Sequence, residues 1–149
     1  MSTAVHLAAP DDMKRLLPLV RAFHAEMEIE MDEGVRQGAI APMLTGIPQG
    51  AIYLIGPRTA PVGYVALAFG WSIQMGGLDG FIEEFYVRPA VRGRGMGGEV
   101  LHALAQTLKG AGLKSLHLEA SRTNPRIRGL YERWGFVAND DYYLMTWQA

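Results

Sequence analysis

A turn rich in glycine and arginine, residues 87–98, constrains the fold of this chain of 149 residues more than any other segment. It follows a run of aromatic and β-branched residues, Phe81–Val87, which predicts a strand. It precedes apolar residues at helical spacing, which predict a helix ending near Gly110–Gly112. The segment therefore predicts a strand–turn–helix unit, in which free backbone N–H groups and the helix dipole attract a phosphate.

The remaining patterns predict a mixed α/β sheet flanked by helices, and no repeat or composition break divides residues 1–149. Apolar residues at three- and four-residue steps predict a helix starting near Pro10, and a less regular helix over residues 33–44. Another helix is expected from Asn124, its N-cap, to Gly135. The other predicted strands are residues 3–8, 51–55, 62–69, 115–120 and 142–147, with a hairpin turn at 58–60.

The composition excludes several classes of site. The 14 Lys and Arg residues against 15 Asp and Glu give a net charge of −1, which argues against nonspecific electrostatic binding of nucleic acid. The absence of cysteine rules out disulfides, Cys-ligated zinc and a thiol nucleophile, and the 4 histidines lack metal-ligand spacing. No apolar run approaches the roughly 20 residues that span a bilayer, and no signal-peptide pattern is present. We expect a cytoplasmic, metal-free protein without a membrane or nucleic-acid partner.

The turn itself fits a phosphate better than it fits the common nucleotide-binding motifs. Its glycines leave no side chain between the amides and a ligand, and Arg92 and Arg94 add positive charge. It lacks the Lys-Ser/Thr ending of a nucleoside triphosphatase loop. A dinucleotide-binding fingerprint would belong to the first strand–helix unit, whereas this turn comes late in the chain.

Two motifs resemble those of the GCN5-related N-acetyltransferase (GNAT) superfamily. The core motif of that superfamily, Arg/Gln-x-x-Gly-x-Gly/Ala, is matched by residues 92–97, and residues 82–89 are similar to the strand before it. A second motif, Asn-x-x-Ala-x-x-Leu-Tyr-x-x-x-Gly-Phe, is similar to residues 124–136. The departure is Ile127, where the pattern usually has alanine. The two motifs in this order are a strong joint signal.

The resemblance covers essentially the whole chain and implies one GNAT domain over residues 1–149, with a mixed, mostly antiparallel sheet flanked by helices. It implies that acetyl-CoA is the cosubstrate and that no metal is needed. It further implies that backbone groups of Tyr86 and Val87 contact the pantetheine arm and the thioester carbonyl, and that Asn124 also contacts the cofactor. The residues implied to bind the diphosphate are Arg92, Gly93, Arg94, Gly95, Met96, Gly97 and Gly98.

Acetyl transfer to an amine requires a base, because an alkyl amine has a pKa of about 10.4 and is mostly charged at neutral pH. Glu83 and Glu84 are the candidates by position. Adjacent strand residues point to opposite faces, so at most one of the two faces the acetyl group. Regular alternation places Glu84 on a face with Ile82 and Tyr86, and Glu83 on the other face. The choice between the two carboxylates stays open.

The leaving thiolate needs a proton, and an oxyanion needs main-chain donors. The resemblance implies that Tyr131 is the acid and that a local splay after Val87 supplies a donor. Periodicity alone favours a core tyrosine at position 131, whereas the surrounding Leu-Tyr and Gly-Phe pairs favour the acid role. Acidic residues at 26–33 either attract a polyamine or basic peptide or form a solvated helix end.

The sequence therefore predicts an N-acetyltransferase that acts by direct transfer in a ternary complex. The expected acceptor is a primary amine of a small molecule, such as a polyamine or amino acid, or of a peptide. The alternatives are a catalytically silent acyl-CoA-binding sensor on the same fold and a nucleotide-binding domain. The identity of the amine and the oligomeric state, including a homodimer, stay open.

Overall fold

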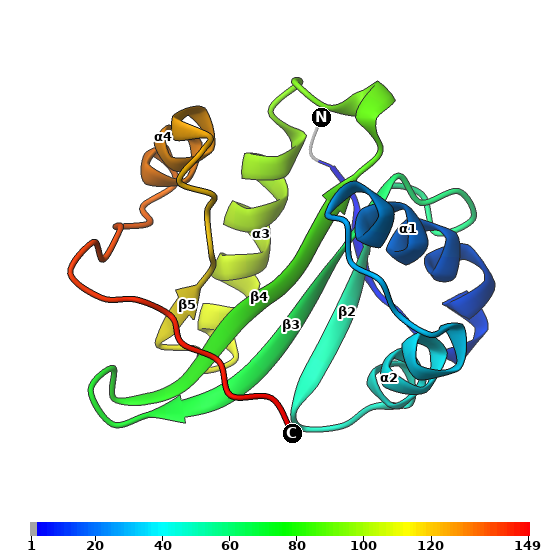
Figure 1. Ribbon diagram of the computed structural model, residues 1–149, viewed down its shortest axis with the longest axis horizontal. Helices are drawn as coiled ribbons and strands as arrows, with labels where there is room; N and C mark the ends of the chain where they lie inside the picture. Colours follow the sequence, from blue (N-terminus) through cyan, green and yellow to red (C-terminus); the bar gives the residue numbers. More distant parts are fainter. Residues whose placement is uncertain (1–2) are drawn as a thin grey trace. The chain divides into compact units, whose positions relative to one another are not determined.

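The computed structural model describes residues 3–149 and divides the chain into two compact units, one ending at Leu118 and one spanning Glu119–Ala149. The first unit holds a five-stranded sheet in the order β1-β2-β3-β4-β5 (Figure 1). Its strands are β1 (Val5–Leu7), β2 (Gly50–Ile55), β3 (Gly63–Ser72), β4 (Gly77–Val87) and β5 (Ser115–His117). The first four pair antiparallel, and β5 runs parallel to β4. The sheet is mixed and mostly antiparallel, as predicted.

Three helices of the first unit cover the two faces of this sheet. The helices α1 (Met13–Glu26) and α2 (Glu33–Thr45) share one buried cluster with β2, β3 and the end of β4. The helix α3 (Met96–Gly110) lies on the other side of the sheet (Figure 1) and contributes buried residues outside that cluster. Within residues 3–149, no helix is long and apolar enough to cross a membrane.

The local signals at the ends of these elements explain where they begin. The short helix η1 (Pro10–Asp12) precedes α1, and the buried carboxylate of Asp12 accepts a hydrogen bond of 2.9 Å from the Ala9 N–H. The predicted hairpin turn between β2 and β3 is confirmed by the bond from the Ala60 N–H to the Pro57 carbonyl, 3.0 Å long. Both predicted first helices are confirmed with boundaries within a few residues.

A β-bulge interrupts β4 at Glu83. Ala66 of β3 pairs with Glu84 and the next residue, Leu67, pairs with Ile82, so the strand register shifts by one residue at Glu83. Directly paired residues share a face of the sheet. Ala66 belongs to the cluster under α1 and α2, whereas Leu67 is buried outside it. The prediction that Glu84 and Ile82 share a face is therefore wrong, because the extra residue of a bulge breaks the alternation.

Two predicted strands differ from the structure. The strand expected over residues 115–120 is shorter, and its pairing with β4 ends at His117 opposite Phe81. The strand expected over residues 142–147 is wrong, because that segment has no regular secondary structure. Alternating side chains stabilise a strand only when its backbone pairs with a neighbour, and no strand of the described chain pairs with this segment. Its large side chains are exposed, for example Met145 at 89%.

The second unit contains the helix α4 (Pro125–Arg133), close to the predicted range. Pro125 occupies the first helical position as expected, but the side chain of Asn124 makes no capping hydrogen bond. Arg128 connects the helix to the following segment through two hydrogen bonds to Asp140, at 3.2 and 3.0 Å.

Candidate active site

The turn between β4 and α3 owes its shape to glycine. Gly93 and Gly95 have φ angles of 80° and 77°, a left-handed conformation that glycine adopts without steric cost. Gly95 is the N-cap of α3. A Cβ atom added at either glycine would meet no atom within 4 Å, so the turn is open on its outer side. Backbone conformation, and not crowding, requires glycine at these two positions.

The first turn of α3 leaves backbone donors free. The first bond of the helix runs from the Glu99 N–H to the Gly95 carbonyl and is 3.1 Å long. The N–H groups of Met96, Gly97 and Gly98 precede this bond, and none has a hydrogen-bond acceptor among residues 3–149. Unpartnered N–H groups at the positive end of a helix dipole favour an anion. The geometry therefore fits a phosphate ligand.

Arg92 connects this turn to the end of α1. Its guanidinium forms two bonds to the carboxylate of Glu26, of 2.8 and 2.6 Å, and its Nε donates to the Val87 carbonyl at 2.7 Å. It also lies 5.4 Å from the centre of the Tyr86 ring. The hydrogen bond from Arg92 lowers the pKa of Glu26. Arg92 therefore holds the turn in place, whereas Arg94 is exposed and leaves its charge available to a ligand.

The free edge of β4 begins where β5 ends. Pairing between β4 and β5 stops at Phe81. The two strands therefore separate earlier along β4 than the splay expected after Val87. The Arg88 N–H donates to the Val62 carbonyl at 2.8 Å, which makes Val87 opposite Gly63 a non-hydrogen-bonded pair. The N–H and C=O groups of Val87 therefore point to the free edge, whereas those of Tyr86 point to β3.

Glu84 lies in a hydrogen-bond network under α1 and α2. The Tyr64 hydroxyl donates to Oε1 of Glu84 at 2.8 Å, and Nε2 of His24 lies 2.7 Å from Oε2. His24 in turn accepts a 3.1 Å bond at Nδ1 from Nε of Arg36. Burial and the negative charge of Glu84 raise the pKa of Tyr64 well above its usual value, so its hydroxyl stays protonated. The Glu84 side chain keeps 25% of its surface exposed.

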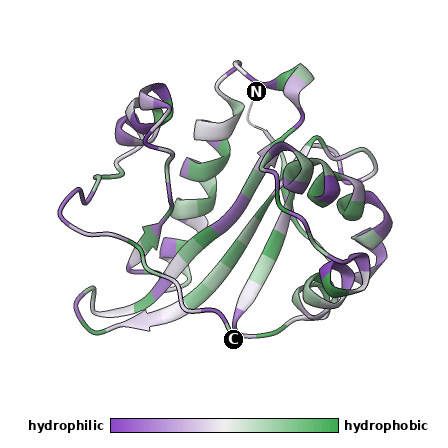
Figure 2. Cartoon of the chain, viewed as in Figure 1, coloured by the Kyte–Doolittle hydropathy of each residue, from purple (hydrophilic) through white to green (hydrophobic). Residues whose placement is uncertain are grey.

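The two candidate carboxylates differ in their surroundings. Glu83 is exposed at the bulge, and Glu84 is partly buried among donors. The pair interrupts the largely apolar second half of β4, and Figure 2 shows that this strand carries hydrophilic as well as hydrophobic stretches. Sequence reasoning missed His24, Arg36 and Tyr64. The one signal for His24 was its place on the apolar stripe of α1, one turn after Val20.

The remaining predicted site residues belong to the second unit. Tyr131 lies on α4 and packs against Phe136, with ring centres 5.9 Å apart. Burial raises the pKa of Tyr131 above its usual value. The Phe136 N–H donates to the Tyr131 carbonyl at 3.1 Å, which ends the helix next to the predicted Gly-Phe pair. The phenol is therefore held within its own unit by the motif residues that follow it.

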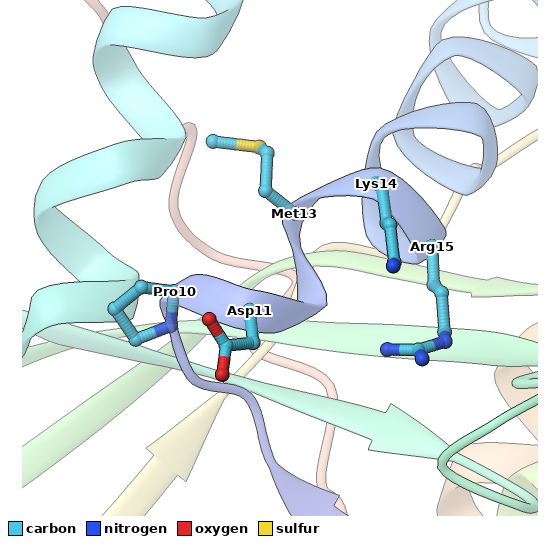
Figure 3. Close-up of a pocket in the computed structure, with 5 residues that line it drawn as sticks. All are labelled: Pro10, Asp11, Met13, Lys14 and Arg15. Atoms are coloured by element: carbon cyan, nitrogen blue, oxygen red, sulfur yellow. The ribbon is translucent and has the colours of Figure 1, made fainter.

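A surface pocket lies at the other end of α1 and contains no predicted site residue (Figure 3). Its lining residues are Pro10, Asp11, Met13, Lys14 and Arg15. Lys14 and His24 are ten positions apart on α1, about 15 Å along the helix axis. The pocket is therefore separate from the network of Glu84. Within residues 3–149, no group of three or more His, Cys, Asp or Glu side chains is placed to hold a metal ion.

A family model described as the acetyltransferase (GNAT) family matches residues 19–136. The chain belongs to the GNAT family. Members of the GNAT family are acetyltransferases that generally use acetyl-CoA as their cosubstrate. The matched range contains both the turn after β4 and the motif around Tyr131, so the family resemblance of the sequence is confirmed.

Three solved structures show the range of similar proteins. An integron cassette protein from the mobile metagenome of Cole Harbour Salt Marsh is 31% identical, with a TM-score of 0.83 over 97% of this chain and 90% of its own. An aminoglycoside acetyltransferase from an uncultured soil metagenomic sample, solved with sisomicin, is 13% identical, with a TM-score of 0.79 over 99% and 96%. Ribosomal-protein-alanine N-acetyltransferase from Brucella melitensis biovar Abortus 2308 is 18% identical, with a TM-score of 0.76 over 99% and 100%. The last two show a shared GNAT fold.

Proposed function

We propose that this protein transfers the acetyl group of acetyl-CoA directly to a primary amine. The observation that carries the proposal is the arrangement along β4. Within three residues the strand presents a partly exposed carboxylate, Glu84, and an outward backbone amide, Val87. Three residues of strand span about 10 Å, and the turn with free amides follows directly (Figure 1).

In this proposal, the turn binds the diphosphate of acetyl-CoA. The amides of Gly93–Gly98 donate to the phosphate oxygens, and Arg94 adds charge from the exposed side. Met96 acts through its backbone N–H. Arg92 instead holds the turn in place, because its N–H donates to the Pro89 carbonyl and its side chain is bound to Glu26. Val87 offers its amide to the pantetheine arm or to the thioester carbonyl. The ring of Tyr86 supports the turn through its cation–π contact with the Arg92 guanidinium.

Glu84 is the proposed base. It takes a proton from the acceptor ammonium, directly or through one water, so that the neutral nitrogen attacks the thioester carbon. The carbon–sulfur bond then breaks, and the sulfur leaves with the electron pair. From its motif, we assign the proton for this thiolate to Tyr131, and a cofactor contact to Asn124. Glu83 is not needed for this scheme, because the bulge places Glu84 among the donors.

The acceptor is proposed only as a primary amine, of a small molecule or of a peptide. The two GNAT structures of low identity belong to an aminoglycoside enzyme and a protein N-acetyltransferase, so one fold accepts unlike amines. Binding of acetyl-CoA, CoA, ATP and NAD should first be compared by calorimetry. Release of free CoA should then be followed with polyamines, amino acids, aminoglycosides and peptide N-termini.

The expected result is binding of acetyl-CoA and CoA, and rapid release of CoA with one class of amine. Binding of acetyl-CoA without turnover on any amine would favour an acyl-CoA sensor. Binding of ATP or NAD in preference to CoA would contradict the proposal and favour a nucleotide-binding domain.

A further inference from the structure

We propose that Arg36 holds His24 in the tautomer protonated at Nε2, and that His24 in this form positions Glu84 as the base. Arg36 and His24 are thus positioning residues that act through Glu84. The role of Glu84 as the base rests on the proposed acetyl transfer, whereas the tautomer of His24 does not. The protonation state of His24 is a property of the protein itself.

The contacts of the buried imidazole define its tautomer. His24 is 5% exposed, and each ring nitrogen has one partner. Nε of Arg36 lies 3.1 Å from Nδ1, and a guanidinium nitrogen can only donate. Nδ1 must therefore present its lone pair. A neutral imidazole carries one N–H, so the proton is on Nε2, which lies 2.7 Å from Oε2 of Glu84 and donates to it.

The same geometry disfavours the charged form of His24. A second ring proton, on Nδ1, would face the N–H of Arg36, and the hydrogen bond between them would be lost. The pair of His24 and Glu84 is therefore a neutral donor on a carboxylate and not an ion pair. The charged and titratable groups around it are Arg36 and Glu33 from α2, Tyr64 from β3 and Tyr86 from β4.

The Arg36 side chain is held by Glu33, and its backbone belongs to the first turns of a capped helix. The carboxylate of Glu33, one turn earlier on α2, binds Nη1 of Arg36, and it also accepts a 2.8 Å bond from Nε of Arg21 on α1. Asp32 caps α2 through bonds to the Gly34 and Val35 N–H groups, at 2.9 and 3.2 Å. The Arg36 side chain is 11% exposed. The guanidinium of Arg36 is therefore held in position by contacts other than its hydrogen bond to His24.

In this arrangement His24 orients Glu84 and does not relay a proton. Both ring nitrogens are occupied, so the imidazole cannot accept a proton from Glu84 and pass it on. Each Glu84 oxygen receives one donor, from Tyr64 and from His24, and a carboxylate has about four acceptor positions. The remaining positions stay open to an amine or a water. The network therefore orients Glu84, and the proton leaves through its exposed side.

The direct test is the tautomer of His24 in the full chain. Long-range proton–nitrogen NMR of protein with ¹⁵N-labelled histidine distinguishes the two ring nitrogens, and His24→Gln identifies the signals. The spectrum should show the His24 proton on Nε2 and a lone pair on Nδ1. A proton on Nδ1 would overturn the proposal whatever the protein catalyses.

The second test compares two arginines that share Glu33. Arg36→Met removes the donor to Nδ1, whereas Arg21→Met removes an arginine that binds the same carboxylate and does not touch His24. In Arg36→Met, the same NMR experiment should detect His24 with a proton on Nδ1, because nothing then requires a lone pair there. Turnover per folded molecule should fall about tenfold or more, since a misplaced catalytic group is costly. Arg21→Met should keep the wild-type tautomer and rate.

Substitution of His24 provides the rescue test. Gln can donate an amide hydrogen to Glu84, and Leu cannot, although both fill similar space. His24→Gln should therefore keep more turnover than His24→Leu, with acetyl-CoA affinity unchanged in both. Equal rates in these variants would overturn the positioning role. Failure of the wild type to acetylate any amine would instead refute the proposed function. The NMR experiment would still decide the tautomer of His24.

Discussion

At the scale of single residues, Glu83 and Glu84 are adjacent in sequence but differ in chemistry. Glu84 receives donors on both oxygens and keeps an exposed side, whereas Glu83 is exposed at the bulge. Glu84→Gln should lower turnover roughly 10²–10⁴-fold at neutral pH, the usual range for loss of a general base. Higher pH should restore part of the rate, because more of the amine is then neutral. Glu83→Gln is the matched control, and a loss in it as large as in Glu84→Gln would contradict the assignment.

Gly95 is the residue on which binding of the cofactor should depend most visibly. Gly95→Val places a branched side chain on the open side of the turn and in a left-handed conformation, which costs about 1–2 kcal/mol of stability. Gly112→Val is the control, because Gly112 also has a positive φ and open surroundings but follows the other end of α3. Calorimetry should show weaker CoA binding in Gly95→Val only. Unchanged affinity would remove this turn from the site.

Tyr131 is predicted to donate through its hydroxyl alone. Tyr131→Phe keeps the ring that packs on Phe136, so the free energy of unfolding should change by only about 1 kcal/mol. Turnover should fall at least about tenfold, a barrier change of about 1.4 kcal/mol, with unchanged acetyl-CoA affinity. Because burial raises the pKa of Tyr131, the wild-type hydroxyl should stay protonated through the neutral and mildly alkaline range. A folded Phe variant with the wild-type rate would rule out the acid role.

At the scale of the elements, α1 and α2 are joined by charges at their facing ends. The hydrogen bond from Arg21 lowers the pKa of Glu33 from about 4.5 to about 2. A lowered folded-state pKa means that the stabilisation is complete above the unfolded value and is lost as the pH falls from about 4.5 to about 2. The melting temperature should therefore decline more steeply across this window in the wild type than in Glu33→Gln. Parallel declines would show that the exposed pair contributes nothing.

The sequence predicted the elements better than their contacts. Helices and strands were predictable because apolar periodicity and glycine or proline ends are local signals, as in α1, α2 and the hairpin before β3. The bulge was not predictable, because the alternation of residue types does not show where along Ile82–Glu84 the strand register shifts. The network of Glu84 was missed because His24 is 60 positions from Glu84 and Arg36 is 12 positions from His24 in the sequence. The turn after β4 was predictable because its glycines and the unbonded amides at the start of α3 lie in one short segment.

At the scale of the whole molecule, the boundary between the two units makes a testable prediction. The segment that follows Leu118 is exposed and irregular up to Asn124, and Arg122 lies within it. Exposed irregular segments are the preferred sites of proteolysis. Brief digestion with trypsin should therefore first cleave after Arg122, as measured by mass spectrometry, and Arg122→Gln should delay the cleavage. Earlier cleavage within α1 or α3 would contradict the division into units.

The last turn of α1 carries two connections at once. Glu26 holds Arg92 and with it the turn proposed for the diphosphate, and His24, two residues earlier, holds Glu84. Both connections therefore depend on the position of a single helical turn. Thermodynamic linkage then requires reciprocity, so that any factor by which bound CoA changes the affinity for the amine also applies in the reverse direction. The end of α1 gives a physical basis for coupled binding of the two proposed substrates.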